Sequence, residues 1–209
     1  MRAVIFDVDG TLWDSTEHVA ASWRQALDAR GIPSAHVTAG RLKSEFGKLL
    51  PEIGRSLFPD MEKEEALLLT EYLCDAEIEM LRTYHPAPYD GVPELLSALR
   101  AGGHQVSIVS NCQKGYIEMM LSVTGLGPLV DAHLCAGDTG LGKAETIRIA
   151  AERFGLISPV YVGDTSGDET AARAAGIPFI HASYGFGKAA HPDAVIHAPL
   201  ELPEVLKNL

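Results

Sequence analysis

The chain has 209 residues and a formal net charge of −11 at pH 7, and 46% of its residues are hydrophobic. These values are ordinary for a globular protein that buries one sizeable core. Because 28 acidic residues outnumber 17 Lys and Arg, we expect no binding to nucleic acid or to an anionic membrane surface. An anionic substrate would need a locally positive site.

The cysteines Cys74, Cys112 and Cys135 are odd in number and lack the spacing of a disulfide framework or a zinc site. The first residues have the pattern of a strand rather than a signal peptide, and no apolar run approaches the ~18 residues of a membrane span. We therefore expect a protein of the cytoplasm.

Four short apolar runs are each followed by polar residues, and helix-length segments separate the later runs. The runs are residues 3–6, 106–109, 132–135 and 160–162. Short apolar runs of this kind are typical of strands buried on both faces of a parallel sheet. The alternation predicts an α/β fold with a doubly wound, Rossmann-like parallel sheet, whose ligands bind at the carboxyl ends of the strands.

One long segment interrupts this alternation, because only helical periodicity is visible in it. At its start, apolar side chains recur at helical spacing at Val19, Trp23 and Leu27. We predict an all-helical insertion over residues 15–85. The α/β domain is then discontinuous and consists of residues 1–14 and 86–209.

Asp7 and Asp9 follow the first apolar run directly. The period of two in a strand places their side chains on one face, about 6–7 Å apart. Two carboxylates at an apolar strand end repel one another unless a cation or a proton intervenes. The simpler alternative is an ordinary Asp-Gly turn. An EF-hand calcium loop begins similarly, but it needs a later Glu and a preceding helix, which this segment lacks.

Asp164 and Asp168 form a second acidic pair, after the apolar run at 160–162. Asp164 alone could simply cap the next helix. Together with the acids at the end of the first strand, however, this pair could form an all-oxygen site for Mg²⁺.

Ser110 and Asn111 follow another apolar run, and their side chains could hydrogen-bond phosphate oxygens; capping a helix near Gln113 is the alternative. Lys143 opens a predicted helix, where the helix dipole disfavours a cation, so a nearby anion is expected. The preceding residues resemble a nucleotide P-loop, but position 144 is Ala instead of Ser or Thr.

Taken in order, these motifs resemble those of the haloacid dehalogenase-like hydrolase superfamily, phosphatase branch. The first motif is Asp-Val-Asp-Gly-Thr-Leu at 7–12, and Ser110, Lys143 and Asp164 with Asp168 match the next three. The helical insertion is similar to the cap of the phosphoglycolate phosphatase and β-phosphoglucomutase subgroup. The resemblance spans nearly the whole chain.

The resemblance implies that Asp7 is the nucleophile, which forms an aspartyl-phosphate, and that Asp9 is the general acid and base. It implies that Mg²⁺ is held by the Asp7 carboxylate, the Asp9 backbone carbonyl and Asp164, with Asp168 in support. An acid at position 9 favours phosphate esters over carbon–halogen bonds, since only the ester needs a proton for its leaving group.

The resemblance also implies that Ser110 and Lys143 hold the phosphoryl oxygens, with Asn111 and Thr11 as helpers. In the predicted cap, the basic residues Lys43, Lys48 and Arg55 are expected on the second and third helical pieces, around a Phe-Gly-Lys segment at 46–48. One of them, Lys48 above all, could bind a carboxylate or second phosphate of the substrate. The alternative is a solvated helix face.

We therefore expect a Mg²⁺-dependent phosphatase that acts on a small phosphorylated metabolite, as a monomer or weak homodimer. A sugar-phosphate mutase is the alternative within the superfamily, and phosphate release would distinguish the two. A phosphoryl-receiving regulatory module is an alternative from another class, but such a module has no use for a helical insertion of this length.

Overall fold

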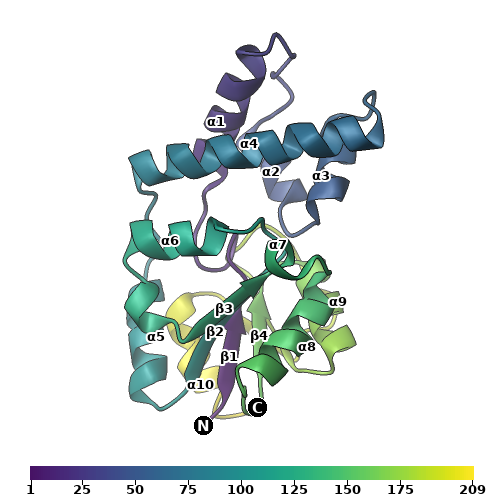
Figure 1. Ribbon diagram of the computed structural model, residues 1–209. Coiled ribbons are helices and arrows are strands. Elements are labelled where there is room, and N and C mark those ends of the chain that lie inside the picture. The colour runs from purple at the N-terminus through teal and green to yellow at the C-terminus, as the bar shows by residue number, and fades with distance from the viewer.

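The computed structural model describes residues 1–209 and contains one parallel sheet of six strands in the order β3-β2-β1-β4-β5-β6 (Figure 1). The strands are β1 (Ala3–Phe6), β2 (Gln105–Ser110), β3 (Ala132–Cys135), β4 (Val160–Gly163), β5 (Phe179–Ala182) and β6 (Ala194–Ile196). The order reverses at β1, which pairs with both β2 and β4. The predicted doubly wound fold is confirmed.

Helices cover both faces of the sheet (Figure 1). On one side are α5 (Val92–Ala101), α6 (Tyr116–Thr124) and α10 (Leu202–Val205), and on the other are α8 (Lys143–Arg153) and α9 (Ser166–Ala175). Alternate residues of β1 face opposite sides of the sheet. Val4 and Phe6 belong to the apolar cluster that includes α5, whereas Ile5 belongs to the apolar cluster that includes α8. Burial on both faces explains why the strands read as continuous apolar runs.

Four helices lie between β1 and α5 in the sequence and above the carboxyl ends of the strands in space (Figure 1). They are α1 (Thr16–Asp28), α2 (Ala39–Glu45), α3 (Leu50–Leu57) and α4 (Lys63–Tyr84), and residues 15–85 contain no strand. We call residues 15–85 the cap.

The cap is packed down on the sheet. The buried side chains of its helices form one apolar cluster with those of α5 and α6. Two hydrogen bonds join the cap to the loop after β2: Asn111 Nδ2 donates to the Gly47 carbonyl at 2.8 Å, and Gln113 Nε2 donates to Glu77 at 2.6 Å. This arrangement is a closed one.

β5 was not predicted from the sequence; it is a four-residue strand that is buried along its whole length. The helix that was expected near Gln113 begins at Tyr116, after Gly115 in the left-handed region. The small α7 (Ala136–Thr139) precedes α8. None of the helices combines the length and apolar character needed to cross a membrane.

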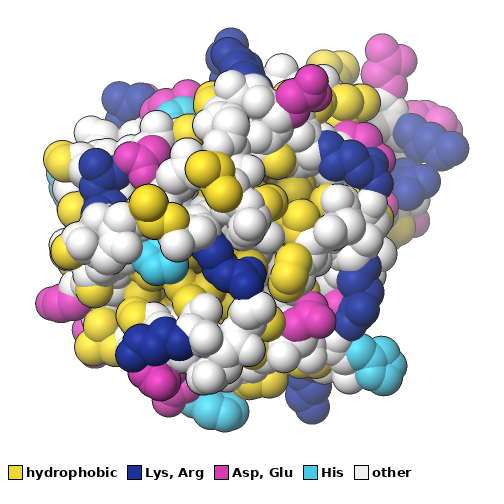
Figure 2. Space-filling model, turned by 90° about the horizontal axis from the view of Figure 1, so that it is seen from below, with side chains coloured by type: hydrophobic (Ala, Val, Ile, Leu, Met, Phe, Trp, Pro, Cys, Tyr) yellow, Lys and Arg dark blue, Asp and Glu magenta, His cyan; other side chains and the backbone are white.

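The face opposite the cap mixes basic, acidic and apolar side chains without a large patch of one kind (Figure 2). The carboxyl ends of the strands, which the candidate site residues follow, lie at the other end of the sheet, beneath the cap.

Leu73 of α4 tests how strongly the cap depends on its apolar packing, because its side chain is fully buried. Leu73→Ala leaves a cavity, so we expect the free energy of unfolding to fall by about 2–5 kcal/mol in urea titrations. The matched control is Leu68→Ala on the same helix, where the side chain is 60% exposed; we expect a change within about 0.5 kcal/mol. Equal losses in the two variants would contradict the packing described.

Candidate active site

Three buried acids and one lysine meet where β1 and β4 end. Asp7 follows β1, Asp164 follows β4, and Asp168 lies in the first turn of α9. Lys143, the first residue of α8, places its Nζ 3.0 Å from Asp7 Oδ1 and 2.5 Å from Asp168 Oδ1. The four side chains are brought together because β1 and β4 are neighbours in the sheet.

These charges shift one another's pKa values. Burial alone would lower the pKa of Lys143, but Asp168 and Asp7 outweigh it and raise that pKa above its usual value. Burial raises the pKa of Asp164 to about 8, and Asp168 and Asp7 add to the rise. Burial also raises the pKa of Asp7, although Lys143 opposes the rise. One lysine therefore does not compensate three acids.

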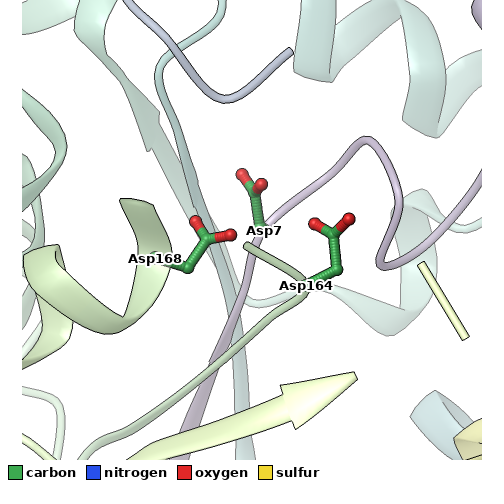
Figure 3. Close-up of side chains that lie close together, drawn as sticks. All are labelled: Asp7, Asp164 and Asp168. Atoms are coloured by element: carbon green, nitrogen blue, oxygen red, sulfur yellow. The ribbon is translucent and has the colours of Figure 1, made fainter. Parts of the chain in front are cut away.

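Oxygen atoms of Asp7, Asp164 and Asp168 lie within 4.8 Å of one another, and the carboxylates converge (Figure 3). Asp164 Oδ1 is buried without a hydrogen-bond partner, and so is Asp7 Oδ1 apart from its ion pair with Lys143. Free, buried carboxylate oxygens are ligands suited to a hard divalent cation such as Mg²⁺. The residues present thus fit a metal ion.

Asp168 has a different environment from the other two acids. Its Oδ1 accepts from Lys143, and its Oδ2 accepts from the Thr165 backbone N–H at 2.9 Å and the Thr165 hydroxyl at 2.7 Å. With both oxygens engaged, Asp168 fixes Lys143 and the start of α9. This agrees with the supporting role that the resemblance implies for it.

Asp164 is enclosed by two glycines and a backbone donor. A Cβ on Gly10 would lie 2.2 Å from Asp164 Oδ2, and a Cβ on Gly185 would lie 2.3 Å from Asp164 Cβ. The Phe186 backbone N–H donates to Asp164 Oδ2 at 2.6 Å. The loop at 185–186 therefore fixes this carboxylate, a role that the sequence analysis did not find.

The Asp9 side chain lies outside the three-acid cluster. Its Oδ1 accepts hydrogen bonds from Trp13 Nε1 at 3.0 Å, the Ser15 hydroxyl at 2.9 Å and the Tyr116 hydroxyl at 2.8 Å. Burial raises the pKa of Asp9 to about 7, while the Tyr116 and Ser15 hydrogen bonds oppose the rise. Ser15 and Tyr116 were not predicted, because nothing in the local sequence joins residues 9 and 116.

A small cavity of about 40 Å³ lies between the cap and the sheet, next to Asp9. Three of the predicted substrate-binding residues line it: Lys48, Ser110 and Asn111. Asn111 Oδ1 is buried there without a partner. Lys143 belongs to the acid cluster instead, and Thr11 is buried with a hydroxyl that has no hydrogen-bond partner.

Lys48 lies in the loop between α2 and α3, not on a helix, and its Nζ pairs with Glu45 at 2.7 Å. Lys43 pairs with Asp14 at 2.7 Å, and Arg55 is exposed on α3 and does not line the cavity. Lys48 is therefore the one basic residue of the cap that reaches the cavity wall.

A family model described as haloacid dehalogenase-like hydrolase matches residues 4–182, most of the chain. The chain belongs to this family. Membership makes it an enzyme of the hydrolase class, and the predicted resemblance to the phosphatase branch of the superfamily is confirmed.

Two relatives illustrate the likeness. A phosphoglycolate phosphatase of Xylella fastidiosa is 34% identical over 191 residues, which cover 88% of this chain and 81% of the relative. Pyrophosphatase PpaX of Bacillus velezensis is 31% identical over 187 residues, covering 84% of this chain and 80% of the relative.

Solved structures share the fold along the whole chain. A predicted phosphatase from Clostridium acetobutylicum superposes with a TM-score of 0.85 at 24% identity, covering 100% of this chain and 99% of the other. A predicted phosphoglycolate phosphatase from Haemophilus somnus also gives 0.85, at 20% identity and with 99% and 98% covered.

Gly185→Ala tests the enclosure of Asp164. The new methyl group would displace this carboxylate, and we expect hydrolysis of a chromogenic phosphate monoester to fall by about 100-fold, as for other small misplacements of catalytic groups. The matched control is Gly127→Ala, where an added Cβ meets nothing within 4 Å. Far-UV circular dichroism checks folding. A folded Gly185→Ala variant with the rate of the wild type would contradict the described role of this loop.

Proposed function

We propose that the protein is a Mg²⁺-dependent phosphatase that hydrolyses a small phosphate monoester through a covalent aspartyl-phosphate on Asp7. The observation that carries the proposal is that Asp7 and Asp9, only two residues apart, lie in different environments. Asp7 Oδ1 is buried among charged groups with a lone pair available, whereas Asp9 is held by three neutral donors beside the cavity.

In the first step, a carboxylate oxygen of Asp7 attacks phosphorus, and the bond between phosphorus and the ester oxygen breaks. Asp9 donates its proton to that oxygen, so the leaving group departs as an alcohol. In the second step, Asp9 accepts a proton from a water molecule as the water attacks phosphorus. The Asp7–phosphorus bond breaks, and inorganic phosphate leaves.

The environment of Asp9 suits both proton transfers. A pKa of about 7 means that the carboxyl group is protonated in part of the molecules near neutral pH and ionised in the rest. A group with a pKa near the working pH is the most effective acid and base. The hydrogen bonds from Trp13, Ser15 and Tyr116 fix its orientation without neutralising it.

The charge of the transferred phosphoryl group needs compensation. Lys143 supplies a permanent positive charge 3.0 Å from Asp7. Ser110 and Thr11 supply hydroxyl groups that can donate to phosphoryl oxygens, and Thr11 Oγ1 has no partner within the protein. Asn111 Nδ2 donates to the Gly47 carbonyl and its free Oδ1 can only accept, so Asn111 would offset this charge only by exchanging that hydrogen bond. Asp7 and Asp164 would hold Mg²⁺, with the Asp9 backbone carbonyl, and the ion would offset negative charge between the nucleophile and the phosphate.

A sugar-phosphate mutase would use the same steps with a sugar hydroxyl in place of water. No feature of the cavity favours it, and release of inorganic phosphate would exclude it as the main activity. The regulatory-module alternative is not retained, because the chain belongs to a family of hydrolases.

Asp7→Asn tests the nucleophile. The amide cannot form the aspartyl-phosphate, so we expect phosphate release from small monoesters in the presence of Mg²⁺ to fall by about 1,000-fold or more. The matched control is Asp60→Asn at an exposed position of the cap, which makes the same change of charge; we expect it to keep the wild-type rate. A folded Asp7→Asn variant that retains more than about a tenth of the rate would remove the assignment.

A further inference from the structure

Glu77 of α4 is a buried acid that the proposed reaction does not use. Its side chain lines the cavity and is only 3% exposed. Trp23 Nε1 donates to its Oε2 at 2.6 Å, and Gln113 Nε2 donates to its Oε1 at 2.6 Å. Burial raises the pKa of Glu77 to about 8, against these two hydrogen bonds, and the charge of Asp9 adds to the rise.

Glu77 lines the cavity into which the leaving group of the proposed reaction would extend. Asp9 lines the same cavity, and Tyr116, which donates to Asp9, is also a wall of it. In the proposed reaction Asp9 protonates the ester oxygen. The remainder of the leaving group therefore extends from Asp9 into the cavity, towards the cap and Glu77.

The charges around this cavity are unbalanced. Its lining contains the acids Asp9 and Glu77 and a single cation, Lys48. The Lys48 ammonium is paired with Glu45, a buried carboxylate of the cap, at 2.7 Å. The aromatic rings of Trp23 and Phe46 form part of the same wall. A cationic group placed there would lie beside the Glu77 carboxyl group, whose ionised form attracts positive charge, and beside aromatic side chains.

We propose that Glu77 selects phosphate monoesters whose leaving group carries an ammonium group and disfavours those whose leaving group carries a carboxylate. This inference rests on the proposed phosphatase function and names the substrate class of the same site. With a pKa of about 8, most Glu77 side chains are protonated near neutral pH in the free protein. A substrate ammonium group beside Glu77 would favour its ionised form and compensate the charge of that carboxylate. A substrate carboxylate would approach Asp9 and Glu77 with only the already paired Lys48 to receive it.

A purely structural role for Glu77 is the competing explanation. Its hydrogen bond from Gln113 joins the cap to the loop after β2 and could serve only to keep the cap closed. In that case a change at Glu77 would alter the hydrolysis of all esters by a similar factor. The two explanations therefore differ in the ratio of rates between substrates and not in the rates themselves.

The test compares three two-carbon monoesters that differ in their terminal group: phosphoethanolamine, 2-hydroxyethyl phosphate and phosphoglycolate. For the wild type with Mg²⁺ we expect kcat/KM to decrease in that order, with at least about tenfold between the first and the last. Glu77→Gln keeps the shape of the side chain but cannot ionise beside a bound ammonium group, so we expect this ratio to shrink by about tenfold, mostly through KM.

Two control variants separate charge from closure. Glu79→Gln removes a charge from an 81% exposed position of the same helix and should leave the ratio unchanged. Gln113→Ala removes the hydrogen bond between cap and loop but keeps the Glu77 carboxylate; it should preserve the order of the three esters even if all rates fall.

The inference is overturned if the wild type hydrolyses phosphoglycolate as efficiently as phosphoethanolamine, or if a folded Glu77→Gln variant keeps the wild-type ratio. The order of the three esters in the wild type is decisive by itself if Glu77→Gln does not fold. Failure of the proposed function has a different result: no phosphate is released from these esters or from a chromogenic monoester.

Discussion

Three carboxylates buried around one ammonium group set the conditions for the rest of this structure. Removing such charges from water is costly, and the cost is offset only by opposite charges and well-placed hydrogen bonds. Lys143 reaches two of the three acids, Asp7 and Asp168. Asp164 is left with one backbone donor and one oxygen without a partner. The local excess of negative charge is why the site fits a divalent cation.

The sheet is what brings these charged side chains together. The strand order reverses at β1, so the loops after β1 and β4 meet at a switch point where a ligand can reach both. The chain approaches so closely at Gly10 and Gly185 that neither position has room for a Cβ beside Asp164. The same edge is covered by the cap, which separates the site from bulk water and so strengthens the electrostatic interactions inside it.

Two aspartates in one short motif acquire different properties from their surroundings. Asp7 lies against Lys143, which favours the ionised form of its carboxyl group. Asp9 points to Trp13, Ser15 and Tyr116, which are neutral, and burial dominates its pKa. Strand periodicity predicts that the two side chains leave the chain on one side, but it does not predict these separate environments.

Much of the fold and the acid cluster could be predicted from the sequence, because parallel strands carry a strong local pattern and their carboxyl ends share one edge. Asp7, Asp164, Asp168 and Lys143 were predicted from that reasoning, and the structure brings them together. Their catalytic roles remain predictions. The short β5 was missed because Pro178 directly precedes it, and Pro is typical of a turn or loop.

Contacts that depend on how distant elements pack or how a loop folds could not be predicted. The hydrogen bond from Tyr116 to Asp9 joins residues 107 positions apart, and Glu77 reaches Gln113 only when α4 lies over the loop after β2. The pairing of Lys48 with Glu45 likewise depends on how the loop at 46–49 folds back on α2.

Thermal unfolding with and without Mg²⁺ tests most directly whether the acid cluster requires a cation. An ion that binds the folded state alone stabilises it, and for a chain of this size we expect the midpoint to rise by roughly 5 °C or more at saturating Mg²⁺. Asp164→Asn should lose most of that rise. The same midpoint for the wild type in Mg²⁺ and in a chelator would contradict the account.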